Sequence, residues 1–169
     1  MLKLTSLSTV FFWLFIVFLS ISVGAGFYEH TLVNSLWTSD PPTSVLGWYQ
    51  HNAADPQFAL SPGRFWMIVS PLTVLFTLLA FVTAFLEKGK ARNWRLVATG
   101  LTLVVMVCTF FWFVPNLRML TGRGVLEMAP DSIASLTNMW ATLNIGRIAV
   151  SSAAWLIGLR ALGMSNVNE

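Results

Sequence analysis

Charge is scarce in this 169-residue chain: only 10% of its residues are Asp, Glu, Lys or Arg. Soluble domains carry about 25% charged residues, so this chain has too few to solvate a globular surface. The shortage excludes an ordinary soluble enzyme and a disordered protein. Ten basic residues stand against seven acidic ones, without a basic stripe interleaved with aromatic residues. This pattern argues against a nucleic-acid partner.

Cysteine and histidine are scarce as well. The single cysteine, Cys108, excludes an internal disulfide and a cysteine-based metal cluster. Haem in a helical bundle needs axial ligands within the helices, whereas His30 and His51 are predicted at a helix end and in a loop. Glu29 and the two histidines have metal-ligand chemistry but no diagnostic spacing. No phosphate-binding, dinucleotide-binding or hydrolase motif is present, so the sequence predicts neither a metal nor another cofactor.

Hydrophobic residues make up 56% of the chain and form long uncharged runs at 4–28, 65–86 and 96–117. A fourth run, 132–159, is interrupted only by Arg147. A helix that crosses the bilayer needs about 20 apolar residues, and each run is long enough. The sequence therefore predicts an all-α membrane protein with one domain, 1–169, made of a four-helix bundle. We expect helices at about 8–29, 64–87, 94–115 and 136–161, with outer loops at 30–63 and 116–135.

The basic residues near the helix ends predict the orientation of the chain. One side receives most of them: Lys3, Lys88, Lys90, Arg92, Arg95 and Arg160. Both termini are therefore expected in the cytoplasm, in a multi-pass protein of the inner (plasma) membrane. The small residues around Gly24 would also permit cleavage of the first segment as a signal peptide. Its long uncharged run favours a retained helix.

The fourth helix carries the longest polar line at helical spacing: Thr137, Trp140, Asn144, Arg147 and Ser151. Arg147 lies about ten residues inside this helix, and a charge at that depth costs about 2.5–3.5 kcal/mol. It should therefore face the bundle. A buried structural ion pair and a ligand-binding or catalytic role both remain open for it.

Glu29, at the outer end of the first helix, is the expected partner of Arg147, and His30 is expected at the rim beside it. Arg64 and Asn116 also belong to the outer ends of their helices, whereas the inner half is expected to contain no intramembrane charge. This asymmetry predicts a pocket that opens outward. Arginines in such a pocket favour an anionic, phenolate-like or quinone-like ligand.

Two segments resemble the anthrone oxygenase-like family of four-helix membrane proteins. The first is Gly24-Ala25-Gly26 running into Tyr28-Glu29-His30, and the second is Trp140-x-x-x-Asn144-x-x-Arg147. Fungal members of the family are implicated in oxidising polyketide anthrones to anthraquinones with molecular oxygen, without a metal cofactor. The resemblance implies an aromatic or quinone-like substrate and cofactor-independent chemistry.

The leading hypothesis is an outward-facing site that binds and oxidises an aromatic small molecule. In it, Glu29 or His30 removes a proton, and Asn144 and Arg147 stabilise the resulting oxyanion. Residues expected to bind the substrate are Tyr28, Arg64, Trp112, Asn116 and Trp140. The alternative is a non-catalytic membrane subunit or accessory protein whose Glu–Arg network is structural. The lipid bilayer is the expected partner, and a homo-oligomer is left open.

Overall fold

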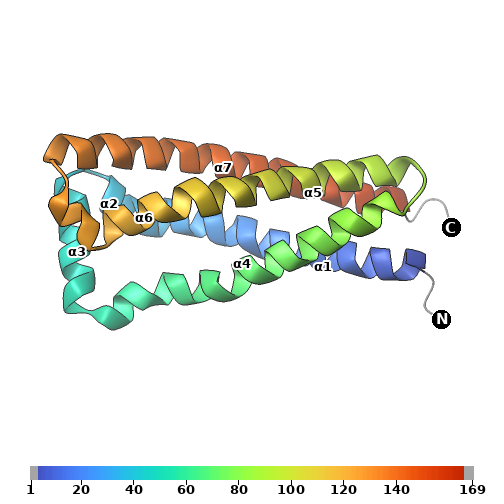
Figure 1. Ribbon diagram of the computed structural model, residues 1–169, viewed down its shortest axis with the longest axis horizontal. Coiled ribbons are helices and arrows are strands. Elements are labelled where there is room, and N and C mark those ends of the chain that lie inside the picture. Colours follow the sequence, from blue (N-terminus) through green and yellow to red (C-terminus); the bar gives the residue numbers. More distant parts are fainter. Residues whose placement is uncertain (1–3, 166–169) are drawn as a thin grey trace. The chain divides into compact units, whose positions relative to one another are not determined.

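The protein is described by a computed structural model over residues 4–165. Within these residues no strand is present, and four stretches are long and apolar enough to cross a membrane: Leu7–Thr38, Gly63–Phe85, Lys90–Thr121 and Pro130–Met164. The predicted all-α fold with four membrane-spanning helices is confirmed (Figure 1). The elements are α1 (Leu4–Tyr28), η1 (Glu29–Asn34), α2 (Ser35–Thr38), α3 (Thr43–Ala54), α4 (Pro56–Phe85), α5 (Lys90–Cys108), η2 (Thr109–Phe113), α6 (Val114–Thr121), η3 (Arg123–Glu127) and α7 (Pro130–Ser165).

The long helices extend beyond the predicted bounds. Helix α7 begins at Pro130 and ends at Ser165, whereas 136–161 was expected. The third predicted helix begins earlier, at Lys90, and its helical path continues through η2 and α6 to Thr121. The physical reason is that a run of uncharged residues marks where the chain can cross hydrocarbon. A helix can continue into the polar region, because charged and polar side chains are tolerated there.

The segment 30–63, predicted as an outer loop, is mostly helical. Helix α3 occupies Thr43–Ala54, and α4 begins at Pro56. Pro41 and Pro42 stand just before α3, and Pro56 is the first residue of α4, where the missing N–H has no intrahelical partner to lose. On α3, Val45 is buried, and Trp48 and Tyr49 pack against the same core cluster. This apolar spacing stabilises the helix.

The described residues fall into two compact units, each of which combines segments from the long helices. Unit 1 takes in α1 up to Gly24, Met67–Met106 and the chain from Ala149 onward. Unit 2 takes in Ala25–Trp66 and Val107–Ile148. The two units are described separately.

Unit 1 has a core in which α1 supplies the bulky side chains. Phe12, Phe15 and Leu19 are buried there against small residues of the other helices: Ala80, Ala98, Ala154 and Ala161. Small residues let helix backbones approach closely, which is how helices associate in a bilayer. Gly158 belongs to this pattern, because an added Cβ would lie 2.3 Å from Cδ1 of Ile16.

Hydroxyl groups link the helices of unit 1 at a few points. Ser22 of α1 lies 3.1 Å from the hydroxyl of Thr73 in α4, and Trp155 of α7 donates to Ser20 Oγ at 2.7 Å. Thr77 instead donates to the carbonyl four residues earlier in its own helix. The hydroxyl groups of α1 and α4 thus meet at Ser22 and Thr73, whereas Thr77 is satisfied within its own helix.

A buried ionic cluster lies in unit 1, close to the end that contains the α4–α5 turn. Arg95 has 3% of its surface exposed and forms an ion pair with Glu87. Glu87 also accepts a hydrogen bond from Ser8, and the Arg95 guanidinium lies 4.7 Å from the ring centre of Phe12. The sequence placed Arg95 at the very start of the predicted helix 94–115. Because α5 begins at Lys90, Arg95 instead lies more than one turn inside the helix.

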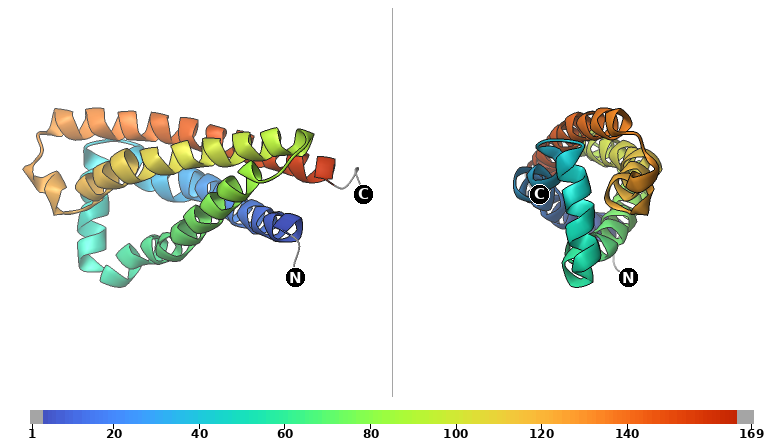
Figure 2. Two further views of the ribbon diagram at one scale, coloured as in Figure 1. Left: turned by 45° about the vertical axis from the view of Figure 1, so that its right-hand side comes forward. Right: turned by 90° about the vertical axis from the view of Figure 1, so that its left-hand side faces the viewer.

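Figure 2 shows the end of unit 1 that contains the turn between α4 and α5. The start of α1, the turn between α4 and α5 and the last turns of α7 lie at one end of the unit (Figure 1; Figure 2, left). The ion pair and the contact of Arg160 in α7 with the Trp94 ring of α5, at 4.8 Å, hold these segments together.

Candidate functional site around Glu29 and Arg147

Unit 2 is built around aromatic rings. Trp140 of α7 is 4% exposed and lies 5.1 Å from the Trp37 ring of α2. Phe113 of η2 packs edge-on against both Trp112 and Trp140, with ring centres 4.7 and 6.0 Å apart. Trp140 Nε1 also donates to the carbonyl of Phe113 at 3.2 Å. These contacts fix the α7 face that carries Asn144 and Arg147.

Two π-helical segments occur in unit 2, and both carry residues of the candidate site. Glu29 is the first residue of η1, and Phe113 is the last of η2. In η2 the Val114 N–H bonds to the carbonyl of Thr109, five residues earlier, and Pro115, which has no N–H, follows directly. Such wider turns change which residues share a helix face and are frequent at functional sites.

Arg147 is held by neighbours from two helices. Its Nε donates to Asn144 Oδ1 at 3.0 Å, one turn earlier in α7. Its guanidinium carbon lies 5.2 Å from the ring centre of Phe113. Asn144 itself is buried, with 1% of its surface exposed. A cation over an aromatic face is attracted by the ring electrons, more strongly where water is excluded.

Glu29 lies at the same site and approaches it from the end of α1. Its Oε2 accepts a hydrogen bond from Trp66 Nε1 of α4 at 3.0 Å. The charges of Glu29 and Arg147 are near enough to influence each other electrostatically, so the two residues lie in the same region of unit 2. We call Glu29, Trp66, Phe113, Asn144 and Arg147 the Glu29–Arg147 cluster.

His30, the other candidate base, is half-buried next to Glu29 in η1. Its Nδ1 is buried and has no hydrogen-bond partner among residues 4–165. Buried ring nitrogens are normally hydrogen-bonded. His30 therefore has an unused proton-transfer group close to the cluster in sequence.

The residues predicted to bind substrate have different surroundings. Trp140 and Trp112 belong to the aromatic core described above. Asn116 Nδ2 donates to the carbonyl of Trp112 in its own helical turn, at 2.7 Å. Tyr28 is 62% exposed and Arg64 is also exposed. The described contacts thus give Trp112 and Asn116 a local packing role and leave Tyr28 and Arg64 at the surface.

The small-residue segment before Glu29 is less crowded than its sequence suggests. A Cβ added at Gly24 would meet no atom within 4 Å, and one added at Gly26 would lie 3.6 Å from Ile148 Cγ1. The latter is an ordinary van der Waals distance. Close helix approach therefore does not account for the glycine at either position.

The sequence did not single out Trp66 or Phe113 as site residues. Trp66 has a readable signal, because it shares a helical face with the polar residues Ser70, Thr73 and Thr77. Phe113 gives no such signal. Its place beside Arg147 depends on the π-helical turn of η2, which the residue pattern does not encode.

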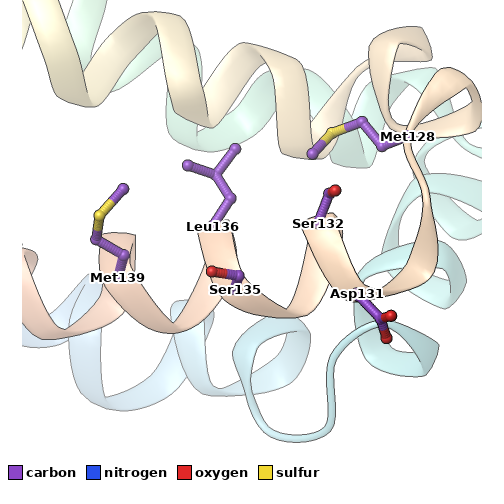
Figure 3. A pocket seen from close by; sticks show the side chains of 6 residues that line it. All are labelled: Met128, Asp131, Ser132, Ser135, Leu136 and Met139. Carbon is purple, nitrogen blue, oxygen red and sulfur yellow. The ribbon is translucent and has the colours of Figure 1, made fainter.

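A shallow depression with a volume of about 450 Å³ lies at the beginning of α7 (Figure 3). Its walls are Met128, Asp131, Ser132, Ser135, Leu136 and Met139. Figure 3 shows Ser132, Leu136 and Met139 projecting to one side of α7. None of the residues predicted for the site lines this depression, so it is distinct from the outward-facing pocket that the sequence predicts.

A family model described as anthrone oxygenase matches residues 64–157, more than half of the chain. The matched segment includes Trp66, Phe113, Asn144 and Arg147. It begins at residue 64 and therefore does not include Glu29. No curated protein and no solved structure matched the chain. The extent of the family match shows that the chain belongs to the anthrone oxygenase family.

Proposed function

We propose that this protein is a membrane-bound oxygenase that converts an anthrone-like aromatic ketone to the corresponding quinone at the Glu29–Arg147 cluster. The observation that carries the proposal is that the family match includes Asn144 and Arg147, which meet through a 3.0 Å hydrogen bond in unit 2. A guanidinium and an amide are the donors that a developing oxyanion requires.

The proposed reaction begins at the methylene carbon opposite the substrate carbonyl. Glu29 or His30 takes one proton from that carbon, and the electron pair moves to the carbonyl oxygen as an oxyanion. Arg147 and the Asn144 amide stabilise this oxyanion. The anion then reacts with O₂ at the former methylene carbon, and the resulting peroxide anion takes back the proton from the base to give a hydroperoxide. Loss of water from the hydroperoxide leaves a second carbonyl, so that one O₂ is consumed for each quinone and each water formed.

The test is oxygen consumption by the purified protein in mild detergent, with anthrone as the probe. We expect equal amounts of O₂ consumed and anthraquinone formed, at a rate above that of the spontaneous reaction. Arg118→Leu is the matched control for a substitution at Arg147, because Arg118 is an exposed arginine of α6. Oxidation no faster than in the absence of protein, with anthrone and with hydroxylated anthrones, would overturn the proposal.

The two candidate bases can be separated by substitution. If Glu29 is the base, Glu29→Gln lowers turnover by about 100-fold or more, because general-base catalysis typically contributes a factor of this order. If His30 is the base, His30→Gln produces that loss and Glu29→Gln produces a smaller one. Wild-type turnover in both Glu29→Gln and His30→Gln would show that another group removes the proton.

The non-catalytic alternative makes a different prediction. If the Glu29–Arg147 cluster only locks the bundle, Glu29→Gln and Arg147→Leu lower thermal stability in detergent, and native extracts contain no bound aromatic molecule. Native mass spectrometry of the extracted protein distinguishes the two, because an oxygenase of this kind should retain an aromatic ligand in its wild-type form and lose it in Arg147→Leu.

We further propose that the protein spans the inner (plasma) membrane with both termini in the cytoplasm. The support is the basic set Lys88, Lys90 and Arg92 in and just after the short α4–α5 connection, because short loops rich in Lys and Arg stay on the cytoplasmic side. A reporter domain that is active only in the cytoplasm should be active when fused to either terminus. Activity of a reporter that requires the outer side would reverse the orientation.

A further inference from the structure

Four cations gather at the end of unit 1 that contains the α4–α5 turn. Lys88 and Lys90 are exposed in this turn and at the start of α5, Arg92 is half-buried in the first turns of α5, and Arg160 is exposed near the end of α7. The Arg160 guanidinium stacks on Trp94 of α5, which brings the end of α7 to this group. We call Lys88, Lys90, Arg92 and Arg160 the basic end.

No carboxylate among residues 4–165 neutralises the basic end. The acidic residue next to it, Glu87, is already engaged by Arg95 and Ser8. Each of the four cations is without an ion pair in the described part of the chain. Four like charges so close together repel one another unless counter-charge comes from outside.

Arg92 has a guanidinium donor that the described residues leave unsatisfied. Its Nε is buried and has no hydrogen-bond partner within the described residues. Buried side-chain donors nearly always have a partner. Arg160 makes its described contact with the face of a tryptophan ring, and such stacking leaves the edge of the guanidinium, with its N–H donors, available for an anion.

The position of the basic end along the helices indicates what that anion is. One membrane-spanning stretch ends at Phe85 and the next begins at Lys90, with Lys88 between them. Trp94 lies one turn further into α5, and tryptophans of this kind concentrate at the membrane interface. This is the height at which phospholipid headgroups lie, and clusters of four or more Lys and Arg beside a membrane helix bind anionic ones.

We propose that the basic end of unit 1 is a binding site for the phosphate of an anionic phospholipid headgroup. Arg92 and Arg160 donate hydrogen bonds to the phosphate oxygens, and Lys88 and Lys90 contribute charge from the turn. The site is separate from the Glu29–Arg147 cluster and does not depend on the proposed oxygenase activity.

The experiment is native mass spectrometry of the full-length protein in mild detergent with equal amounts of phosphatidylglycerol and phosphatidylcholine of the same acyl chains. The wild-type protein should retain phosphatidylglycerol preferentially. Lys88→Gln with Lys90→Gln should reduce that preference by about fivefold for each cation removed, the effect expected of a basic residue at an anionic membrane surface. Both lysines are exposed, so this variant should fold normally.

The matched control removes two positive charges elsewhere, by Arg118→Gln with Arg123→Gln, which are exposed residues of unit 2. The control should keep the wild-type preference. Equal retention of both lipids by the wild-type protein overturns the proposal, and so does an equal loss in the control, which would indicate a general effect of net charge. Displacement of the lipid by the same concentration of inorganic phosphate would mean that the site takes free phosphate.

A second variant tests the geometry, since the lysine result reports mainly on charge. Arg92→Lys keeps the charge but loses the guanidinium Nε donor. It should weaken phosphatidylglycerol retention. Raised salt should weaken the retention that remains more than in Lys88→Gln with Lys90→Gln, because that variant keeps the less-screened Arg92 whereas Arg92→Lys relies on exposed lysines. Full retention in Arg92→Lys would remove Arg92 from the site.

Discussion

Each compact unit contains one buried arginine, and the two have different partners. Arg95 in unit 1 is paired with Glu87, which lies eight residues before it, on the other side of a short turn. Arg147 in unit 2 bonds to an amide, stacks on a ring and interacts with Glu29 from a distant part of the chain. The first arrangement is local, and the second joins three long helices.

The contrast separates a structural charge from a candidate functional one. Arg95 sits against a carboxylate, a hydroxyl and a ring, as expected of a pair that closes a helical hairpin. The partners of Arg147 include a neutral amide and a tryptophan-bound carboxylate. Buried ionisable groups within membrane spans are costly and are most often functional. The family match covers both arginines, so the distinction between them rests on their different partners.

The largest expected effect on stability is at Arg95. Arg95→Leu should lower the free energy of unfolding by about 3–5 kcal/mol, because it leaves Glu87 as an uncompensated buried charge. Chemical denaturation in detergent, followed by circular dichroism, measures it. Replacing both partners, with Glu87→Leu added, should recover most of the loss, since an apolar pair of similar size avoids the buried charge. A single variant as stable as wild type would show that Arg95 is not structural.

The next effect concerns catalysis at Asn144. Asn144→Leu should lower kcat by about 100-fold, the scale seen when one oxyanion donor is removed. The comparison variant is Thr142→Leu, an exposed position two residues earlier on α7, which should keep its activity. If Asn144→Leu turns over anthrone normally, the oxyanion site lies elsewhere.

Trp66 offers a smaller and more specific test, because Trp66→Phe keeps an aromatic ring and removes the N–H bonded to Glu29. A hydrogen bond to a charged group contributes about 1.5–3 kcal/mol, so kcat should fall by about tenfold with little change in KM. Trp13→Phe, at an exposed site on α1, is the control. An unchanged kcat would remove Trp66 from the positioning of Glu29.

The smallest predicted difference compares one glycine from each unit. Gly26→Ala should stabilise the protein by about 0.5–1 kcal/mol, because alanine restricts the unfolded chain and fits the helix; its Cβ meets Ile148 at an ordinary distance. Gly158→Ala should give no such gain, because its Cβ would press on Ile16 at 2.3 Å. Melting temperatures of the two variants measure this, and equal shifts would contradict the packing described for unit 1.

Much of the fold could be predicted from the sequence. The uncharged runs identify four membrane-spanning helices because charge in hydrocarbon is costly, and the structure has four such stretches. The helix ends were harder to predict, since helices such as α4 begin among polar residues and prolines. Helix α3 was missed because Pro41 and Pro42 suggest a turn and say nothing of the apolar face of Val45, Trp48 and Tyr49.

The site could be predicted only in part, for a different physical reason. Helical spacing places Asn144 and Arg147 on one face. Because charged residues are scarce, Glu29 is the expected partner of Arg147. Spacing does not reveal π-helical turns, so the contact of Phe113 with Arg147 was not predictable. Arg95 was predicted at the start of its helix because it stands among the basic residues near that helix end, and the start of α5 at Lys90 places it more than one turn inside the helix.

The most direct test of the contrast between the two arginines is the turnover of anthrone by Arg147→Gln, measured together with its unfolding in the same detergent. Arg118→Gln is the matched control. Our account predicts a loss of kcat of about 100-fold or more and a smaller loss of stability than Arg95→Leu suffers. Turnover equal to that of the control, in a protein that is clearly destabilised, would contradict it and would make Arg147 a structural residue like Arg95.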